Sequence, residues 1–188
     1  MQLKISSITN LTDARFFNAA GANFLGFSFD VLNENNSSIS NAKEIVNWLY
    51  EPVVVGEFGN HQTKEEIEFI AKEMPLNEIQ IPFSHSQKNE LNFDKFLVLD
   101  DWRTVHNMSV ADFFIIKISE ANIHDAVLKN FIGNNKVFIE ADFTKENIQE
   151  IIESLNPYGI QFTCKKEEKT GFSAVDKYAE LLEIINFL

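Results

Sequence analysis

The sequence predicts an α/β protein in which eight parallel βα units close into one barrel. Short runs of β-branched and aromatic residues alternate with segments of helical period along the whole chain, which is typical of βαβ units. The apolar runs number eight, and eight parallel strands close a (β/α)8 TIM barrel. We therefore expect residues 1–188 to form a single compact barrel domain. It is short for this fold, for which roughly 250 residues are typical.

The expected strands are short apolar runs spread evenly along the chain. They cover residues 3–8, 24–29, 53–58, 78–81, 96–99, 113–118, 137–141 and 160–163. The fourth should end at Ile81, because Pro82 has no N–H to donate to a neighbouring strand.

Three of the intervening segments carry the apolar i, i+3, i+4, i+7 stripe of a helix that rests on a sheet. These stripes begin at Ala42, Ile67 and Ile148. A capping box is expected at Thr63 with Glu66, and a similar Ser-x-x-Asp pattern begins at Ser173. Residues 86–91 and 104–110 are weakly periodic, so we expect only single turns or irregular structure there. The turn-forming residues 33–41 should lie at the barrel mouth.

Composition excludes several classes of partner. The formal net charge is −12, and a negative protein without a basic run repels phosphate backbones and anionic membranes. No apolar stretch approaches a membrane span or a signal peptide. The single cysteine, Cys164, cannot form an internal disulfide, which is compatible with a reducing compartment. We expect an acidic cytoplasmic protein with no nucleic-acid or membrane partner.

Motifs in the first sixty residues point to a known family. Residues 4–10 read K-I-S-S-I-T-N and precede Asp13-Ala14, Gly21-Ala22 and L-G-F-S-F at residues 25–29; V-G-E-F-G-N follows at residues 55–60, and Glu146-Asn147-Ile148 lies further on. The first group resembles the opening K-I-C-G-I-T-N…D-A…G-A-D…L-G-F-x-F of the phosphoribosylanthranilate isomerases of tryptophan biosynthesis. The later motifs are similar to V-G-V-F-V-N and P-E-N-V of that family. The resemblance implies a TIM barrel and an Amadori isomerase ancestry.

The residues that the family uses for proton transfer are replaced. The resemblance places Ser6 where the family has its cysteine general base, and Lys117 where it has its aspartate general acid. A hydroxyl without an activating partner is a far weaker base than a thiolate. Both catalytic positions, Ser6 and Lys117, are therefore expected to be inactive.

The phosphate site of the family is also altered. The family cradles phosphate on glycine-containing turns after its seventh and eighth strands, where this chain has Ala141-Asp142 and Thr163-Cys164-Lys165. An aspartate is a poor neighbour for a phosphate dianion, which Lys165 and Lys166 offset only in part. The family's arginine in the second loop and its glycine-rich sixth loop have no counterpart here.

The expected strand ends would place a mixed set of polar side chains at the mouth. The pocket candidates are Lys4, Asp30, Glu57, Asp100, Glu140, Asp142 and Thr163. One interpretation is a set of solvated residues and ion pairs, such as Lys117 with Asp100 or Glu140; the other is a remodelled pocket for a cationic or polyhydroxylated ligand. A desolvated Lys117 would instead favour Schiff-base chemistry.

Other reactive side chains give weaker signals. The clustered carboxylates, Asp101 included, suit a hard cation, but the histidines lack metal-ligand spacing and are expected to be scattered surface residues. We expect no metal and no cofactor. Cys164 is expected to be a small buried residue unless Lys165 or Lys166 lowers its pKa.

Three functions remain open from the sequence. The leading hypothesis is an isomerase-like barrel that has lost the isomerase activity and binds a small molecule at its C-terminal face, or serves as an auxiliary protein. The second is a working phosphoribosylanthranilate isomerase that uses substituted acid and base groups such as Glu57, Asp100 or Glu140. The third is another small-molecule lyase or isomerase on the same barrel. We expect a monomer or a homodimer.

Overall fold

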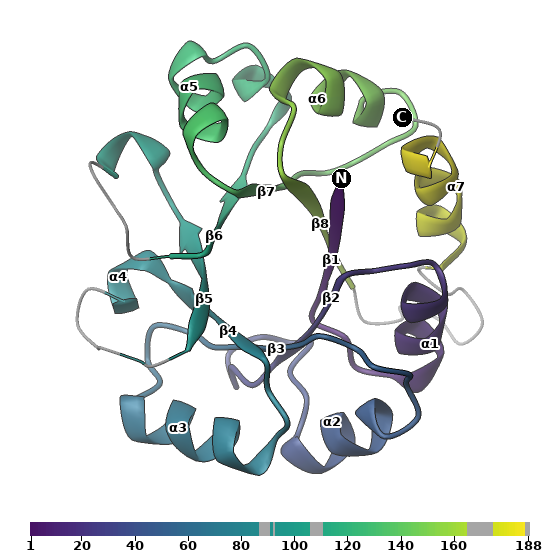
Figure 1. Cartoon of the computed structure of the whole chain (residues 1–188), viewed down its shortest axis with the longest axis vertical. Helices are drawn as coiled ribbons and strands as arrows, with labels where there is room; N and C mark the ends of the chain where they lie inside the picture. The colour runs from purple at the N-terminus through teal and green to yellow at the C-terminus, as the bar shows by residue number, and fades with distance from the viewer. Residues whose placement is uncertain (87–90, 92, 106–110, 165–174, 187–188) are drawn as a thin grey trace.

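A computed structural model describes residues 1–86, 91, 93–105, 111–164 and 175–186 and shows a closed barrel of eight parallel strands (Figure 1). The strands pair in chain order, and the last pairs with the first. They are β1 (Gln2–Ser6), β2 (Phe24–Ser28), β3 (Val54–Glu57), β4 (Glu78–Pro82), β5 (Asp94–Leu99), β6 (Phe113–Lys117), β7 (Val137–Glu140) and β8 (Gly159–Thr163). The predicted fold class and the eight predicted strands are confirmed.

The end of β4 differs from the prediction. Pro82 is the last residue of the strand and lies in register with Val98 of β5, so the expectation that the strand ends at Ile81 was wrong by one residue. A proline donates no hydrogen bond but keeps its carbonyl acceptor. It can therefore close a strand, although it cannot stand in the middle of one.

Helices surround the barrel on its outer side (Figure 1). The longer ones are α1 (Leu11–Ala19), α2 (Ile39–Val46), α3 (Lys64–Glu73), α5 (Ala126–Asn134), α6 (Ile148–Leu155) and α7 (Val175–Asn186); the short ones are α4 (Phe83–Ser86), η1 (Trp102–Thr104) and η2 (Glu120–Asn122). The three helices predicted from apolar stripes are present as α2, α3 and α6. Single turns follow β4 and β5, while residues 87–90 and 106–110 and the pattern at Ser173 lie outside the described residues.

Polar side chains fix where the helices begin. The Thr63 side chain accepts from the backbone N–H of Glu66, and the Glu66 side chain accepts from the N–H of Thr63, so the predicted capping box opens α3. Asn10, Ser38 and Asp125 accept first-turn N–H groups of α1, α2 and α5 in the same way. Each bond satisfies a backbone donor that the helix itself leaves without an acceptor.

Phenylalanine rings fill the barrel at the amino ends of its strands. Phe24, Phe96, Phe113 and Phe138 make ring contacts with centroids 4.6–5.8 Å apart. Since β2 and β6 are not neighbours in the sheet, Phe24 and Phe113 can meet only inside the barrel. A Cβ on Gly159 would lie 2.4 Å from the Phe138 ring, so this position must be glycine to admit the ring. We call these four phenylalanines the aromatic floor.

In the described part of the chain, no helix is both long enough and apolar enough to cross a membrane.

Candidate functional site

The carboxyl ends of the strands bring the predicted site residues to one end of the barrel, opposite the aromatic floor. Ser6, Glu57, Lys117, Glu140 and Thr163 are the last residues of β1, β3, β6, β7 and β8. Parallel strands all end on the same side of a barrel, where TIM barrels hold their ligands. The structure sorts the site residues into two groups that lie on different strands.

The first group is built on a buried ion pair between Lys4 and Glu57. Lys4 is fully buried and Glu57 is 4% exposed, and Lys4 Nζ lies 2.5 Å from Glu57 Oε1. The ammonium also lies 5.6 Å from the centroid of the Phe96 ring, which faces it from the aromatic floor. Of the interpretations open for these two pocket candidates, the structure shows an ion pair, and it lies inside the barrel rather than in solvent.

Glu57 also holds the end of β1. Its Oε2 accepts from the Ser6 hydroxyl at 2.9 Å and from the Ser7 backbone N–H at 3.0 Å. Ser7 has a φ of 58°, a left-handed conformation that glycine adopts without strain, and the related family has glycine here. A Cβ on Gly26 would lie 2.1 Å from Glu57 Oε1, so that glycine leaves the space that the carboxylate occupies.

The loop after β2 joins this group, as the turn-forming residues predicted. Asn33 Nδ2 donates to the hydroxyls of Ser7 and Ser28 at 3.2 and 3.1 Å. Asn35, which is 7% exposed, donates to the backbone carbonyl of Cys164 at 3.2 Å. Sequence reasoning placed the loop at the mouth but missed these two asparagines. Their density in the loop was the available signal, since asparagine side chains commonly bond nearby backbone.

The second group lies on β6, β7 and β8. Lys117 Nζ is 3.6 Å from Glu140 Oε1, which confirms one of the predicted ion pairs, and Gln161 Nε2 donates to Glu140 Oε2 at 2.7 Å. The Lys117 side chain is 72% exposed. A Schiff-base lysine reacts as a neutral amine, which burial favours. Lys117 has no such burial, so the structure does not support Schiff-base chemistry there.

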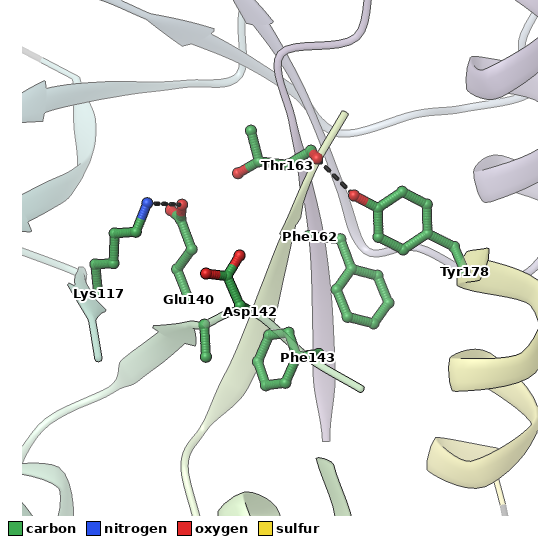
Figure 2. Close-up of a pocket in the computed structure, with 8 residues that line it drawn as sticks. Lys117, Glu140, Asp142, Phe143, Phe162, Thr163 and Tyr178 are labelled. Carbon is green, nitrogen blue, oxygen red and sulfur yellow. Dashed lines mark hydrogen bonds and ion pairs between the residues drawn. The ribbon is translucent and has the colours of Figure 1, made fainter. Parts of the chain in front are cut away.

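A cavity of about 140 Å³ opens between these strands and α7 (Figure 2). Its lining residues are Lys117, Glu140, Ala141, Asp142, Phe143, Phe162, Thr163 and Tyr178. We call it the mouth cavity. The Tyr178 hydroxyl donates to the Thr163 carbonyl at 2.6 Å, and burial raises the pKa of Tyr178 above its ordinary value. Tyr178 therefore ties α7 to the end of β8 as a neutral donor.

A larger hollow of about 450 Å³ shares Ala141 and Asp142 with the mouth cavity. Its other lining residues are Ile118, Ser119, Glu120, Ala121, Asn147 and Ile151. It lies beside the short connection between β6 and η2, where the related family has a longer glycine-rich loop. Asp142 stands on the wall between the two spaces.

The remaining candidates lie apart from the mouth cavity. Asp30, just after β2, is 3.5 Å from His61 Nε2, and Asp100, just after β5, is exposed. Cys164 is 2% exposed, and burial raises the pKa of its thiol. The weak phosphate candidate Lys165, with Lys166, lies outside the described residues.

The histidine expectation needs one correction. His85 is 3% exposed and donates from Nε2 to the Gln62 carbonyl at 2.7 Å, so it is a core residue and not a surface one. His124 is exposed beside Glu150, and His106 is not among the described residues. Within the described ranges, no three histidine, cysteine or carboxylate side chains group closely enough to hold a metal ion.

The chain is similar to known proteins in both sequence and structure. A curated relative, N-(5'-phosphoribosyl)anthranilate isomerase of Pelodictyon phaeoclathratiforme, is 26% identical over 210 aligned positions, which cover 98% of this chain and 97% of the relative. No protein-family model matches the chain.

Solved structures of the same enzyme share the fold. Phosphoribosylanthranilate isomerase of Thermus thermophilus superposes with a TM-score of 0.78 at 21% identity, covering 100% of this chain and 99% of that one. A phosphoribosylanthranilate isomerase solved with reduced 1-(o-carboxyphenylamino)-1-deoxyribulose 5-phosphate gives 0.79 at 18% identity, with all of both chains covered. The Thermotoga maritima enzyme gives 0.77 at 17% identity, also with all of both chains covered.

Fold and mouth together define a (β/α)8 barrel of the class that gathers polar side chains at the carboxyl ends of its strands. Within that class, the chain is similar over its whole length to phosphoribosylanthranilate isomerases, at low sequence identity. The resemblance carried by the opening motif is confirmed along the whole chain.

Proposed function

We propose that this barrel has lost the isomerase activity of its relatives and binds a small molecule at its C-terminal face. The whole-length similarity to phosphoribosylanthranilate isomerases supports the shared barrel. The contacts of Ser6 and Lys117, at the two family catalytic positions, support the loss of activity. We propose further that it acts in the cytoplasm as a monomer or homodimer and without a cofactor.

The contact of Ser6 carries the proposal. A general base must accept a proton from its substrate, yet the Ser6 hydroxyl donates its own hydrogen to Glu57 Oε2 at 2.9 Å. That carboxylate is itself paired with buried Lys4 and bonded by the Ser7 N–H. Lys4, Ser6, Ser7 and Glu57 thus bond to one another and have almost no contact with solvent. Ser6 is therefore a structural donor, and Glu57 has its acceptor sites occupied.

The family's acid position supports the same conclusion. Lys117 stands there, with its ammonium in solvent beside Glu140. The ammonium of a hydrated lysine is a much weaker general acid than the carboxylic acid that the family has at this position. Ser6 at the base position and Lys117 at the acid position are therefore both poor replacements for the family's proton-transfer groups.

One observation favours the alternative of a working isomerase. The Glu140 side chain is 22% exposed, lines the mouth cavity and stands next to the acid position in the sheet. In that alternative, Glu140 replaces the lost aspartate as the proton-transfer group. The remaining alternative, a different lyase or isomerase, would use the same carboxylate.

Turnover of phosphoribosylanthranilate tests the proposal. The substrate is generated in situ and its consumption followed as loss of anthranilate-type fluorescence for the wild type, Ser6→Cys, and Ser6→Cys combined with Lys117→Asp. We expect no turnover by the wild type or by Ser6→Cys, because Ser6→Cys leaves the Lys4–Glu57 pair and the altered phosphate turns in place. Circular dichroism confirms that each variant is folded.

The outcomes separate the alternatives. Turnover by the wild type would refute the loss of activity, and Glu140→Gln then asks whether Glu140 supplies the proton transfer. Turnover only by the double variant supports the proposal, since it shows that the scaffold still binds the substrate and lacks only the two family groups.

A further inference from the structure

Among the described residues that line the mouth cavity, carboxylates outnumber ammonium groups, so this part of the lining carries a net negative charge. Two carboxylates, Glu140 and Asp142, face one ammonium, Lys117. Figure 2 shows the charged ends of these three side chains gathered beside the Thr163 hydroxyl. A site of this polarity repels phosphate and attracts cations. Its charge is thus opposite to the one that the ligands of the related enzymes require.

Two buried polar atoms have no partner among the described residues. Thr163 is one of the residues that line the cavity, its hydroxyl oxygen is buried, and Gln161 Oε1 lies one interior position below it on β8. Gln161 is 2% exposed, and its amide already donates to Glu140, which leaves the carbonyl oxygen as an acceptor. A buried acceptor without a donor is unfavourable by about 1–3 kcal/mol. A ligand that brings N–H or O–H donors to this end of β8 would reduce that cost.

Aromatic rings form the apolar wall of the cavity. Phe162 packs edge-on against Phe143, with centroids 5.5 Å apart, and stacks on Tyr178 at 4.9 Å. Ring faces attract ammonium groups and accommodate short methylene chains. Carboxylates on one side and rings on the other are a combination that suits an alkylammonium better than a sugar phosphate.

We propose that the mouth cavity binds a small ligand carrying a primary ammonium group, which pairs with Glu140 and Asp142 and donates towards Thr163. This inference rests on the proposed binding role and names its ligand class. The volume limits the size of the group: an apolar cavity of about 150 Å³ holds one benzene molecule, so 140 Å³ admits about six non-hydrogen atoms. A longer ligand would extend past Asp142 into the larger hollow.

Lys117 occupies the place of the ligand's cation when the cavity is empty. Its ammonium lies 3.6 Å from Glu140, beyond a short hydrogen bond, and its side chain is 72% exposed. A loose, hydrated pair of this kind contributes little stability, so the lysine can swing into solvent when a ligand ammonium takes its place. Removing the Lys117 charge should therefore strengthen ligand binding.

Binding of 2-aminoethanol, measured by calorimetry and by NMR titration of the whole chain, tests the proposal. Ethylene glycol is the matched neutral probe, because it replaces the ammonium by a hydroxyl at equal size. Inorganic phosphate is the probe of the opposite charge. We expect 2-aminoethanol to bind about tenfold to a hundredfold more tightly than ethylene glycol, which is the gain in affinity expected from one or two charge-assisted hydrogen bonds. Phosphate should not bind.

Paired variants assign the effect to the cavity. Glu140→Gln should weaken 2-aminoethanol binding by about tenfold or more, and Lys117→Met should strengthen it several-fold. The matched controls are Glu153→Gln on α6 and Lys129→Met on α5, which change the net charge equally on exposed helices away from the cavity. Both controls should bind as the wild type does. Circular dichroism and Tm confirm that the variants are folded.

The proposal is overturned by any of three results: equal affinity for 2-aminoethanol and ethylene glycol, unchanged binding by Glu140→Gln, or phosphate binding that displaces the amine. These readouts are independent of isomerase turnover. Turnover together with amine binding would refute the proposed loss of activity and leave this inference standing. Absence of both turnover and amine binding would refute this inference and leave the proposed loss of activity standing.

Discussion

Replacing Lys4 by methionine removes a charge from the barrel interior and keeps an unbranched side chain that is one atom shorter. Lys4 is fully buried and Glu57 nearly so, so the variant leaves a buried carboxylate without its cation. Removing one partner of a buried ion pair destabilises by about 3–5 kcal/mol. For a chain of this size, 1 kcal/mol corresponds to about 2–4 °C. We therefore expect Lys4→Met to lower the Tm by about 6–20 °C.

The second half of the experiment removes the stranded charge. Glu57→Gln keeps an oxygen that accepts from Ser6 and from the Ser7 N–H, so Lys4→Met combined with Glu57→Gln loses both charges and keeps the bonds to the end of β1. The double variant should be more stable than Lys4→Met alone. Urea unfolding at neutral pH measures the four free energies of unfolding of this double-mutant cycle.

Two results would contradict a buried, interacting Lys4–Glu57 pair. If Lys4→Met is destabilised by less than about 1 kcal/mol, the ammonium is not carrying the buried charge of Glu57. If the two substitutions simply add, the pair is not an interacting unit. Either result would refute the assignment of Glu57 as a fully engaged carboxylate, and with it the main reason for treating Ser6 as inactive.

Three further predictions concern other sites. The Cys164 thiol, whose pKa burial raises, should react with a disulfide reagent at least about a hundredfold more slowly in the native protein than in denaturant; fast native reaction would show that it is accessible. Gly26→Ala should destabilise by about 1–3 kcal/mol in urea unfolding, because its Cβ would lie 2.1 Å from Glu57 Oε1, whereas Gly133→Ala, with open space around it, should not destabilise. The N–H groups that open α5 hold the pKa of Asp125 below its ordinary value, so its stabilisation is present above the unfolded-state pKa and is lost as pH falls through the folded one. The Tm difference between the wild type and Asp125→Ala should therefore be constant near neutral pH and shrink below about pH 4; a difference that grows on acidification would contradict this.

The fold was predictable because its signal is local. Runs such as F-F-I-I at residues 113–116 and V-F-I at residues 137–139 are buried on both faces of the sheet, as parallel strands require. The number of such runs in the sequence therefore gives the number of strands in the barrel. The end of β4 was predicted one residue too early. Whether the absent N–H of Pro82 ends the strand depends on the residue paired with it on the neighbouring strand. That neighbour cannot be read from the chain around it.

The candidate site was only half predictable. The Lys117–Glu140 pair follows from two strand ends that are adjacent in chain order, and it was anticipated. The Lys4–Glu57 pair joins residues separated by 53 positions on strands that are not neighbours, so only the interior of a closed barrel brings them together. A signal was present in Gly26, which alternation places on the interior side of β2 between them.

The aromatic floor makes the two ends of the barrel interior different, with packed rings at the amino end and polar side chains at the mouth. Four rings close the amino end of the strands, and the Lys4 ammonium lies directly beyond one of them. Because the rings lie on the amino side of the Lys4–Glu57 charges, we expect water and denaturant to reach these charges from the mouth, past the residues at the ends of β1, β2 and β3. We therefore expect hydrogen exchange at the Ser7 amide, which donates to Glu57 Oε2, to report local opening of the mouth.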